Sequence, residues 1–137
     1  MNKKTILVLL VSLQSCTSVA TENYSCPEKI LAQTNVEEIS NEWTAQVGNS
    51  NHYLVSASFS DGNPLEKFIL SPSQVSESPS PNEDDAVTYD LSSIDSPWLI
   101  CNYGNTPATL VKPLEKQYSK CKVTLPKDAS EQIITCE

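Results

Sequence analysis

The stretch HYLVSASF, residues 52–59, carries the clearest structural signal in the chain. Read as an extended segment, it separates most of its bulky apolar side chains from its serines. One face holds Tyr53, Val55, Ala57 and Phe59, and the other holds Leu54, Ser56 and Ser58. A two-residue period is that of a half-buried β-strand. We therefore expect a strand over residues 52–59.

A turn follows this strand at Asp61-Gly62-Asn63-Pro64. Glycine accepts a positive φ, and proline cannot donate a backbone hydrogen bond to a neighbouring strand. Residues 65–70 can then return beside residues 52–59 as the second strand of a hairpin. Further strand patterns recur toward the C-terminus, at 86–91, 98–103, 108–111, 121–125 and 133–136.

Short strands joined by turns predict an all-β fold, and we expect a small antiparallel β-sandwich or open barrel. One short helix has room at 28–39, although Thr34-Asn35 interrupts its pattern. Residues 71–85 differ from the rest, since they contain three prolines, five serines and the acidic run Glu83-Asp84-Asp85. Because such a segment buries little apolar surface, we expect it to be an exposed, mobile loop.

Residues 1–20 have the pattern of a secretory signal peptide. Lys3 and Lys4 precede a short apolar stretch, and Ser18-Val19-Ala20 forms the cleavage site. A second interpretation is a lipoprotein box at 13–16, which would anchor the chain to lipid through Cys16; Gln14 fits such a box poorly. We favour export to the periplasm as a single secreted domain over 21–137. No segment reaches the roughly 20 apolar residues that a transmembrane helix needs.

Four cysteines remain after the expected cleavage: Cys26, Cys101, Cys121 and Cys136. An even number in an exported chain indicates two disulfides, each adding roughly 2–4 kcal/mol of stability. Four cysteines allow three pairings. A meander topology would place the strands that carry Cys121 and Cys136 side by side around a turn. This favours the pairs Cys121–Cys136 and Cys26–Cys101 over the other two pairings.

The chain is strongly acidic, with nine lysines, no arginine and 17 Asp and Glu residues. Between residues 22 and 95, 13 acidic residues are accompanied only by Lys29 and Lys67. Nucleic acids and anionic lipids are bound by clusters of Lys and Arg, so this composition argues against both as partners. The acidity serves solubility, and it equally allows electrostatic steering toward a basic protein.

Signals of catalysis and cofactor binding are missing from the sequence. His52 is the single histidine, and no cysteine or acidic residue stands near it at catalytic spacing. Oxidised cysteines provide no thiolate for catalysis or metal binding. The run Glu83-Asp84-Asp85 lacks the alternating ligand spacing of a calcium loop. We therefore expect a protein that is not an enzyme and has no cofactor and no metal site.

Exposed turns are the candidate contact surface for a partner protein, because loops on a rigid scaffold often carry binding residues. Two groups of residues and two possible rim contacts are predicted to bind the partner. They are Asp61, Gly62 and Asn63 in the first turn, Glu83, Asp84 and Asp85 in the acidic run, and Tyr103 and Asn105 beside the turn at Gly104.

Two sequence motifs are more specific than the others: VSASFSDGNPLE at 55–66 and WLICNY at 98–103. Together with Cys26-Pro27, Trp43, Lys112-Pro113-Leu114 and the later cysteines, they span most of residues 21–137. This combination resembles an uncharacterised family of small exported proteins of Gram-negative bacteria, known by an STY-type label. Tyr89 departs from the pattern, because that family is expected to have tryptophan there.

Some members of that family are similar to type VI secretion immunity proteins, which protect the periplasm against peptidoglycan-targeting effectors of the L,D-transpeptidase-like kind. The resemblance implies a periplasmic binding protein that occludes the active site of a toxin. Two other functions also fit a small, exported, acidic domain. The first is an inhibitor of host lysozyme or another secreted hydrolase, and the second is an envelope structural lipoprotein.

Overall fold

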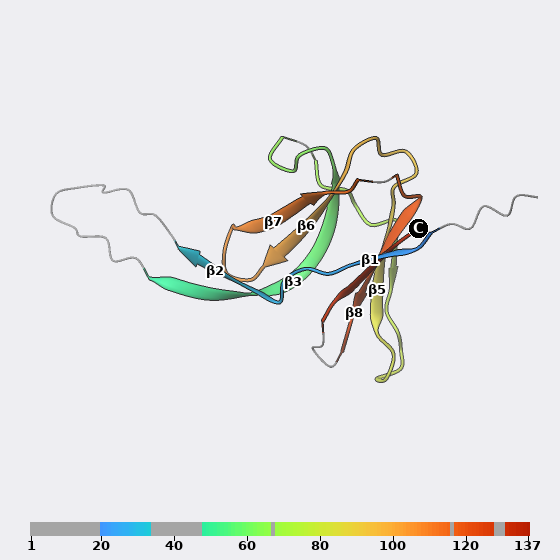
Figure 1. The fold of residues 1–137 in the computed structure, drawn as a ribbon. Helices are drawn as coiled ribbons and strands as arrows, with labels where there is room; N and C mark the ends of the chain where they lie inside the picture. The colour runs from blue at the N-terminus through green and yellow to red at the C-terminus, as the bar shows by residue number, and fades with distance from the viewer. Residues whose placement is uncertain (1–19, 34–47, 67, 116, 128–130) are drawn as a thin grey trace, which may run out of the picture.

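Nine β-strands form the secondary structure of residues 20–33, 48–66, 68–115, 117–127 and 131–137, which are the residues that the computed structural model describes (Figure 1). The strands are β1 Glu22–Tyr24, β2 Lys29–Gln33, β3 Asn49–Asp61, β4 Gln74–Ser76, β5 Asp85–Asp90, β6 Pro97–Tyr103, β7 Thr109–Pro113, β8 Lys120–Leu125 and β9 Ile133–Cys136. They make two antiparallel sheets, with the orders β1-β9-β8-β5-β4 and β2-β3-β6-β7. The predicted all-β fold is confirmed.

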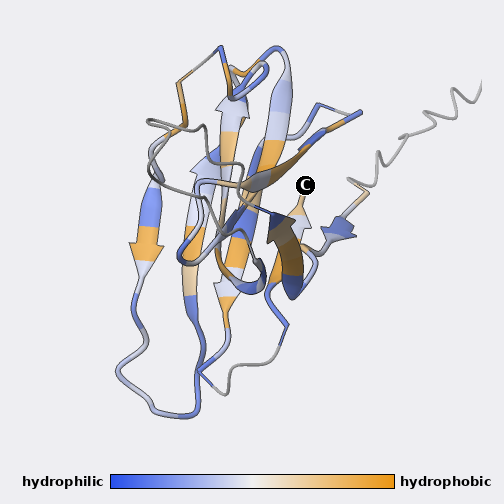
Figure 2. Ribbon diagram, turned by 90° about the vertical axis from the view of Figure 1, so that its left-hand side faces the viewer, coloured by the Kyte–Doolittle hydropathy of each residue, from blue (hydrophilic) through white to orange (hydrophobic). Residues whose placement is uncertain are grey.

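The core lies where the second half of β3 and its neighbours pack against the five-stranded sheet. Phe59 of β3 is fully buried, and its ring meets that of Tyr89 from β5 edge-on, with 5.0 Å between the ring centroids. Buried side chains from both sheets surround this pair: Ala57, Leu99, Cys101, Tyr103, Cys121, Val123, Ile134 and Cys136. Along the strands, hydrophobic bands alternate with polar ones (Figure 2). This alternation is what a sheet buried on one face requires.

A β-bulge in β3 changes which side of the strand is buried. The register between β3 and β6 shifts at Val55, which is the extra residue. On the N-terminal side of the bulge, Leu54 packs against the core, whereas Tyr53 and Val55 are 57% and 60% exposed. The prediction that Tyr53 and Val55 share a face with the buried Phe59 is therefore wrong. One inserted residue moves all side chains beyond it to the opposite face.

Residues 65–70 do not return as a strand beside β3, which corrects the predicted hairpin. The neighbours of β3 are β2 and β6. Among the described residues of the returning segment, Ile69 forms an isolated bridge with Ser60. The cause is Asn63, whose side-chain oxygen accepts a hydrogen bond from the N–H of Leu65 and whose carbonyl accepts one from Glu66. These bonds hold in a turn the residues that a hairpin would need extended.

Two segments without a clear strand pattern form short edge strands. Gln74–Ser76, inside the predicted loop 71–85, pairs with β5 as β4, and Asp85 already belongs to β5. β4 is exposed throughout, as expected of this segment, but it is not part of an irregular loop. Strand β2 occupies Lys29–Gln33, where a short helix had room; residues 34–39 lie outside the described part of the chain. Pairing with a neighbouring strand outweighs weak local preferences.

Two disulfides connect the strands in the predicted pairing. Cys121–Cys136 joins directly opposed positions of β8 and β9. Cys26–Cys101 joins the segment between β1 and β2 to β6, and so ties the passage from one sheet to the other. The predicted connectivity is confirmed, and bonded cysteine pairs of this kind indicate an oxidising compartment.

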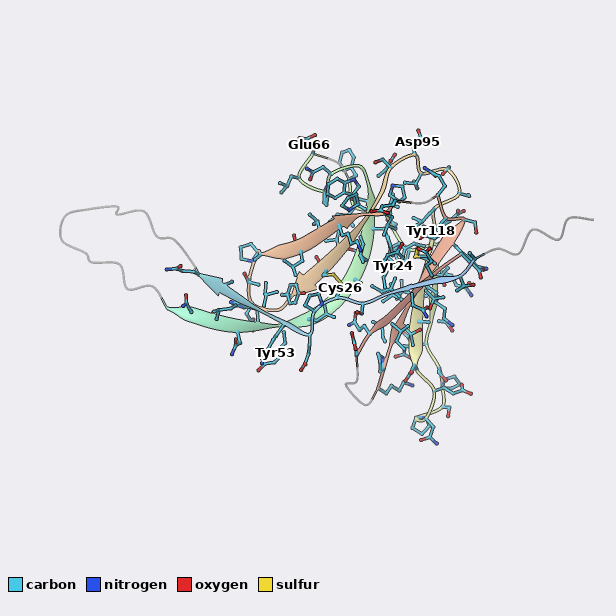
Figure 3. The ribbon with its side chains drawn as sticks, in the orientation of Figure 1. Tyr24, Cys26, Tyr53, Glu66, Asp95 and Tyr118 are labelled. Atoms are coloured by element: carbon cyan, nitrogen blue, oxygen red, sulfur yellow. A yellow bond between two sulfur atoms is a disulfide. The ribbon has the colours of Figure 1, made fainter. Side chains whose placement is uncertain are left out.

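A pair of tyrosines, the buried Tyr118 and the partly buried Tyr24, holds β1 against the segment that precedes β8 (Figure 3). Tyr118 is 5% exposed, and its hydroxyl donates to the carboxylate of Glu22 at 2.6 Å. The hydroxyl of Tyr24 donates to the same carboxylate at 3.0 Å, and the two rings meet edge-on. Burial, followed by the hydrogen bonds to Glu22 and Tyr24, raises the pKa of Tyr118 well above its ordinary value.

The predicted signal peptide falls almost entirely on residues outside the described part of the structure, and so does Cys16. Cleavage and lipid attachment therefore stay predictions. The mobility expected of residues 71–85 also stays a prediction, because a single structure does not measure motion. Within the ranges that the structure does describe, no helix is long and apolar enough to cross a membrane.

Candidate functional site

A cleft lies beside the middle of β3, between this strand, the segment after β1 and the described residues at the two ends of the connection from β8 to β9. Cys26 and Tyr53, two of the residues that line it, are labelled in Figure 3. The volume of the cleft is about 720 Å³. Three chain segments line it, contributing Cys26 and Glu28, then Tyr53, Leu54 and Val55, and finally Leu125, Pro126, Glu131 and Gln132. The cleft therefore uses both sheets and the segment that connects them.

The first wall of the cleft is the segment after β1, and three contacts hold it to the four-stranded sheet. The disulfide of Cys26 with Cys101 fixes its start. The hydroxyl of Tyr103 donates to the carbonyl of Pro27 at 2.9 Å. A backbone N–H of β3 donates to the carbonyl of Glu28 at 2.8 Å. With its backbone fixed in this way, Glu28 presents an exposed carboxylate at the cleft.

The second wall is the part of β3 that contains the bulge and the two residues before it. Here Tyr53 and Val55 present large side chains to solvent. The turn between β6 and β7 closes behind them, because the N–H of Gly104 donates to the carbonyl of Tyr53 at 2.9 Å. A Cβ atom at Gly104 would lie 3.1 Å from Cγ2 of Val55, so glycine permits this close approach. The wall is apolar, exposed and supported from behind.

The third wall is the turn from β8 to β9, and Gln132 connects it to the second wall. The side-chain amide Nε2 of Gln132 donates to the carbonyl of Val55 at 3.1 Å. Its Oε1 atom is buried and accepts no hydrogen bond from the part of the chain that the structure describes. A buried acceptor without a donor costs about 1–3 kcal/mol.

The lining of the cleft carries acidic charge. Glu28 and Glu131 are among the lining residues, and none of the described lining residues is a lysine. Two lysines lie close by. Lys29 is opposite Tyr53 in the pairing of β2 with β3, and the ammonium of Lys127 lies 3.6 Å from a carboxylate oxygen of Asp85. The cleft is thus suited to apolar groups combined with cationic or hydrogen-bond-donating ones.

The predicted contact residues in the first turn lie far from this cleft. Asp61 is seven positions along β3 from Leu54, which corresponds to about 23 Å of strand. The carboxylate of Asp61 accepts a hydrogen bond from the N–H of Ser96 at 3.3 Å, and Gly62 donates to the carbonyl of Ser96 at 2.7 Å. The φ of Gly62 is 86°, and Asn63 caps the turn as described above. These three residues shape a separate surface at the C-terminal end of β3.

The acidic run Glu83-Asp84-Asp85 lies next to the third wall. Asp85 is paired with Leu125 across β5 and β8. The carboxylate of Asp84 accepts a hydrogen bond from the N–H of Lys127 at 3.3 Å. The ammonium of Lys127 also donates to two carbonyls of the connection between β4 and β5, both at 2.9 Å. The acidic run therefore adjoins the cleft without lining it.

The two predicted rim residues have different positions. Tyr103 is 5% exposed and uses its hydroxyl for Pro27, so it is a core residue that supports the first wall and not an exposed contact. Burial raises the pKa of its phenol. Asn105 is exposed with a φ of 59°, in the turn that contacts Val55. Contact of Asn105, the first turn or the acidic run with a partner stays a prediction.

The sequence interpretation missed the residues that line the cleft. The alternation of the sequence placed Tyr53 and Val55 in the core, but the bulge turns their side chains to the opposite face of the strand. Gln132 has no distinguishing pattern around it. The one available signal was Gly104, directly after the WLICNY motif. A glycine at the end of a strand often marks the close approach of another part of the chain.

The single histidine is hydrogen bonded at both ring nitrogens. Nδ1 of His52 lies 2.9 Å from the carbonyl of Gly104, and Nε2 lies 2.7 Å from Oγ of Ser50. Because a carbonyl only accepts, Nδ1 carries a proton and donates it to the carbonyl of Gly104. Neither His52 nor Ser50 lines the cleft, and the hydrogen bond of His52 joins β3 to the turn between β6 and β7. Within the described ranges, no group of three His, Cys, Asp or Glu side chains is placed to hold a metal ion.

The fold and the cleft define a class of protein: a small, disulfide-bonded β protein whose acidic and partly apolar cleft suits contact with another protein. The chain belongs to the type VI secretion system Tli immunity protein family, whose family model matches residues 49–137. The match begins at the first residue of β3 and includes two of the three walls of the cleft. Searches among curated proteins and among solved structures found no match.

Family membership confirms the predicted resemblance to type VI secretion immunity proteins. It supports an immunity role, in which the partner is a secreted effector toxin. It also suggests a non-enzymatic inhibitor.

Proposed function

We propose that this protein neutralises a secreted effector toxin by binding it through the cleft and blocking the toxin's active site. The observation that carries this proposal is the exposure of Tyr53 and Val55, at 57% and 60%, on one wall of a cleft of about 720 Å³. Large apolar side chains at a concave surface are typical anchors of protein interfaces. Because each side chain is already about 40% buried, covering the rest against a partner would contribute roughly 1–2 kcal/mol.

The cleft also offers polar recognition that an inhibitor needs. Glu28 and Glu131 provide two carboxylates for cationic side chains of the partner, and this charge favours partners with Lys or Arg at the contact. Binding of this kind is stoichiometric, with one immunity protein for each toxin.

The proposed toxin attacks peptidoglycan and belongs to the L,D-transpeptidase-like class. The first support is the family resemblance of the sequence motifs. The second is charge, because the chain has a formal net charge of −8 and would complement a basic enzyme that binds the cell wall. Complementary charge accelerates association by about 10–10³-fold at low salt. Rapid capture matters for a protein that must reach a toxin before the toxin reaches its substrate.

The proposed place of action is the periplasm. Two disulfides, each between buried cysteines, support this location because such bonds persist in oxidising compartments. The expected signal peptide at 1–20 supports the same route.

Titration calorimetry would test the proposal directly. The oxidised protein, purified from the periplasm, would be mixed with a candidate L,D-transpeptidase-like effector in a catalytically inactivated form. We expect a one-to-one complex. Tyr53→Ala should raise the Kd by about 30-fold, the size of an interface anchor. Val55→Ala should also weaken binding. Val75→Ala is the matched control, because Val75 is 61% exposed on β4, away from the cleft.

The active, wild-type effector gives the second readout. Peptidoglycan cleavage or cross-linking by the effector should stop at one molar equivalent of the immunity protein. If the folded and oxidised protein does not bind the effector, the proposal is wrong, and inhibition of lysozyme should be tested next. If the complex forms but Tyr53→Ala and Val55→Ala bind as tightly as Val75→Ala, the cleft is not the contact surface.

A further inference from the structure

A second apolar surface protrudes at the C-terminal end of β3, away from the cleft. It is the loop of residues 62–70, called the apolar loop below. Leu65 is 91% exposed and Phe68 is 94% exposed, which are the highest values among the large hydrophobic side chains described by the structure. Ile69 beside them is 58% exposed. Soluble monomers rarely leave neighbouring large apolar side chains so fully in water, so this loop indicates a contact site.

The base of the apolar loop is held by hydrogen bonds on both sides. At its start, Gly62 donates to the carbonyl of Ser96 at 2.7 Å, and the fully buried Ser60 donates its hydroxyl to the carbonyl of Gly62 at 2.7 Å. At its end, the N–H of Leu70 donates to the carbonyl of Phe59 at 2.8 Å. A loop fixed at both ends loses little conformational entropy on binding, so its exposed side chains are effective anchors.

The surroundings of the apolar loop are acidic. Residues 61–70 and 91–96, which the bonds to Ser96 bring together, contain Asp61, Glu66 and Asp95 against one lysine, Lys67. Glu66 and Asp95 lie on the same side of the molecule (Figure 3). An anionic membrane surface would repel these carboxylates, whereas a pocket bordered by basic residues would attract them. The charge therefore favours a protein partner over a lipid surface.

We propose that the apolar loop is a second docking element for the effector toxin. It inserts Leu65 and Phe68 into an apolar pocket of the toxin that is bordered by Lys or Arg side chains. This inference rests on the proposed immunity function and extends it, because the loop is separated from the cleft by about half of the length of β3. At that separation the two sites contribute independently, so their effects on binding are additive.

The test is a binding series with the full-length mature protein and the same inactivated effector. Leu65→Ser combined with Phe68→Ser should raise the Kd by about 30-fold or more, as expected for central interface anchors. Both side chains are more than 90% exposed, so the melting temperature should not change. Val75→Ser is the control for loss of an exposed apolar side chain elsewhere. Combining the loop variant with Tyr53→Ala should multiply the two losses.

Charge reversal gives an independent readout. Glu66→Lys combined with Asp95→Lys should slow association and weaken its dependence on salt, whereas dissociation should change little.

Three outcomes would overturn the inference. If the wild-type protein binds the effector and the double serine variant binds equally well, the loop is not a docking element, while the proposed function stands. If the wild-type protein does not bind, the proposed function and the inference fail together. If the wild-type protein binds vesicles of phosphatidylglycerol and phosphatidylethanolamine, and the double serine variant does not, the occupant is a lipid surface.

Discussion

Removing the two disulfides one at a time should destabilise the protein by unequal amounts, because they close loops of different length. Cys26–Cys101 has a sequence separation of 75, and Cys121–Cys136 has a separation of 15. The variants are C26A/C101A and C121A/C136A. All four cysteines are at most 5% exposed, so the lost packing is similar in the two variants. The comparison therefore isolates the difference in chain entropy.

The loop-closure relation predicts the size of the difference. For a separation of 75 it assigns about 4.5 kcal/mol at 25 °C, and for a separation of 15 about 3 kcal/mol. C26A/C101A should thus be less stable than C121A/C136A by about 1.5 kcal/mol. Since the two loops do not overlap along the chain, removing both bridges should cost about the sum of the two effects.

The assay is equilibrium unfolding in urea, followed by circular dichroism, with the free energy of unfolding extrapolated to water. Equal stabilities, or a lower stability of C121A/C136A, would refute the reasoning and show that native-state contacts of the bridges outweigh loop entropy. Effector binding adds a second comparison. Loss of Cys26–Cys101 also releases the first wall of the cleft, so C26A/C101A should lose more affinity than C121A/C136A does.

Three further predictions concern the core, the tyrosine pair and the first turn. Phe59→Ala should lower the free energy of unfolding by about 3–5 kcal/mol, because it empties the centre of the core; a loss below about 1 kcal/mol in urea unfolding would place the core elsewhere. Stability should fall as the pH rises above about 10, because the pKa of Tyr118 is raised by burial and hydrogen bonding, and the unfolded chain releases this proton first. Urea unfolding at pH 9 and pH 11 should show a smaller fall in Tyr118→Phe, and an equal fall would contradict the assignment. Gly62→Ala should cost about 1–2 kcal/mol at a φ of 86°, whereas Gly48→Ala, with no heavy atom within 4 Å of the added Cβ, should cost less; thermal melting of the two variants would compare them.

Most strands were predictable because each carries its own two-residue alternation. The pattern at 121–125 coincides with β8 except for one residue, and that at 133–136 coincides with β9. Their pairing around a turn also made the Cys121–Cys136 disulfide predictable, since the two cysteines fall opposite each other. β4 was not predictable, because its three residues are all exposed and only their hydrogen bonds to β5 make them a strand.

The candidate site was less predictable than the fold. Glu83, Asp84 and Asn105 were recognised as exposed residues outside the strands, and they lie close to the cleft, whereas Asp85 proved to be a half-buried residue of β5. Tyr103 was assigned to a rim although it is buried, because alternation within a strand does not reveal which of its faces meets the second sheet. Leu65 and Phe68 were assigned to a returning strand, and their exposure follows from the turn at Asn63.

The sequence by itself determined the all-β class, the acidic character and the resemblance to immunity proteins, because each depends on residue types and short spacings along the chain. It favoured one pairing of the cysteines, and the structure decided it, because Cys26 and Cys101 are 75 positions apart. Only the tertiary structure decided which side of β3 is buried and where a cleft forms. The bulge at Val55 and the close approach of Gly104 arise from pairing with β6, which is more than 40 residues away along the chain. A register shift of one residue leaves no trace in local composition, yet it moves Tyr53 and Val55 from the core to the wall of the cleft.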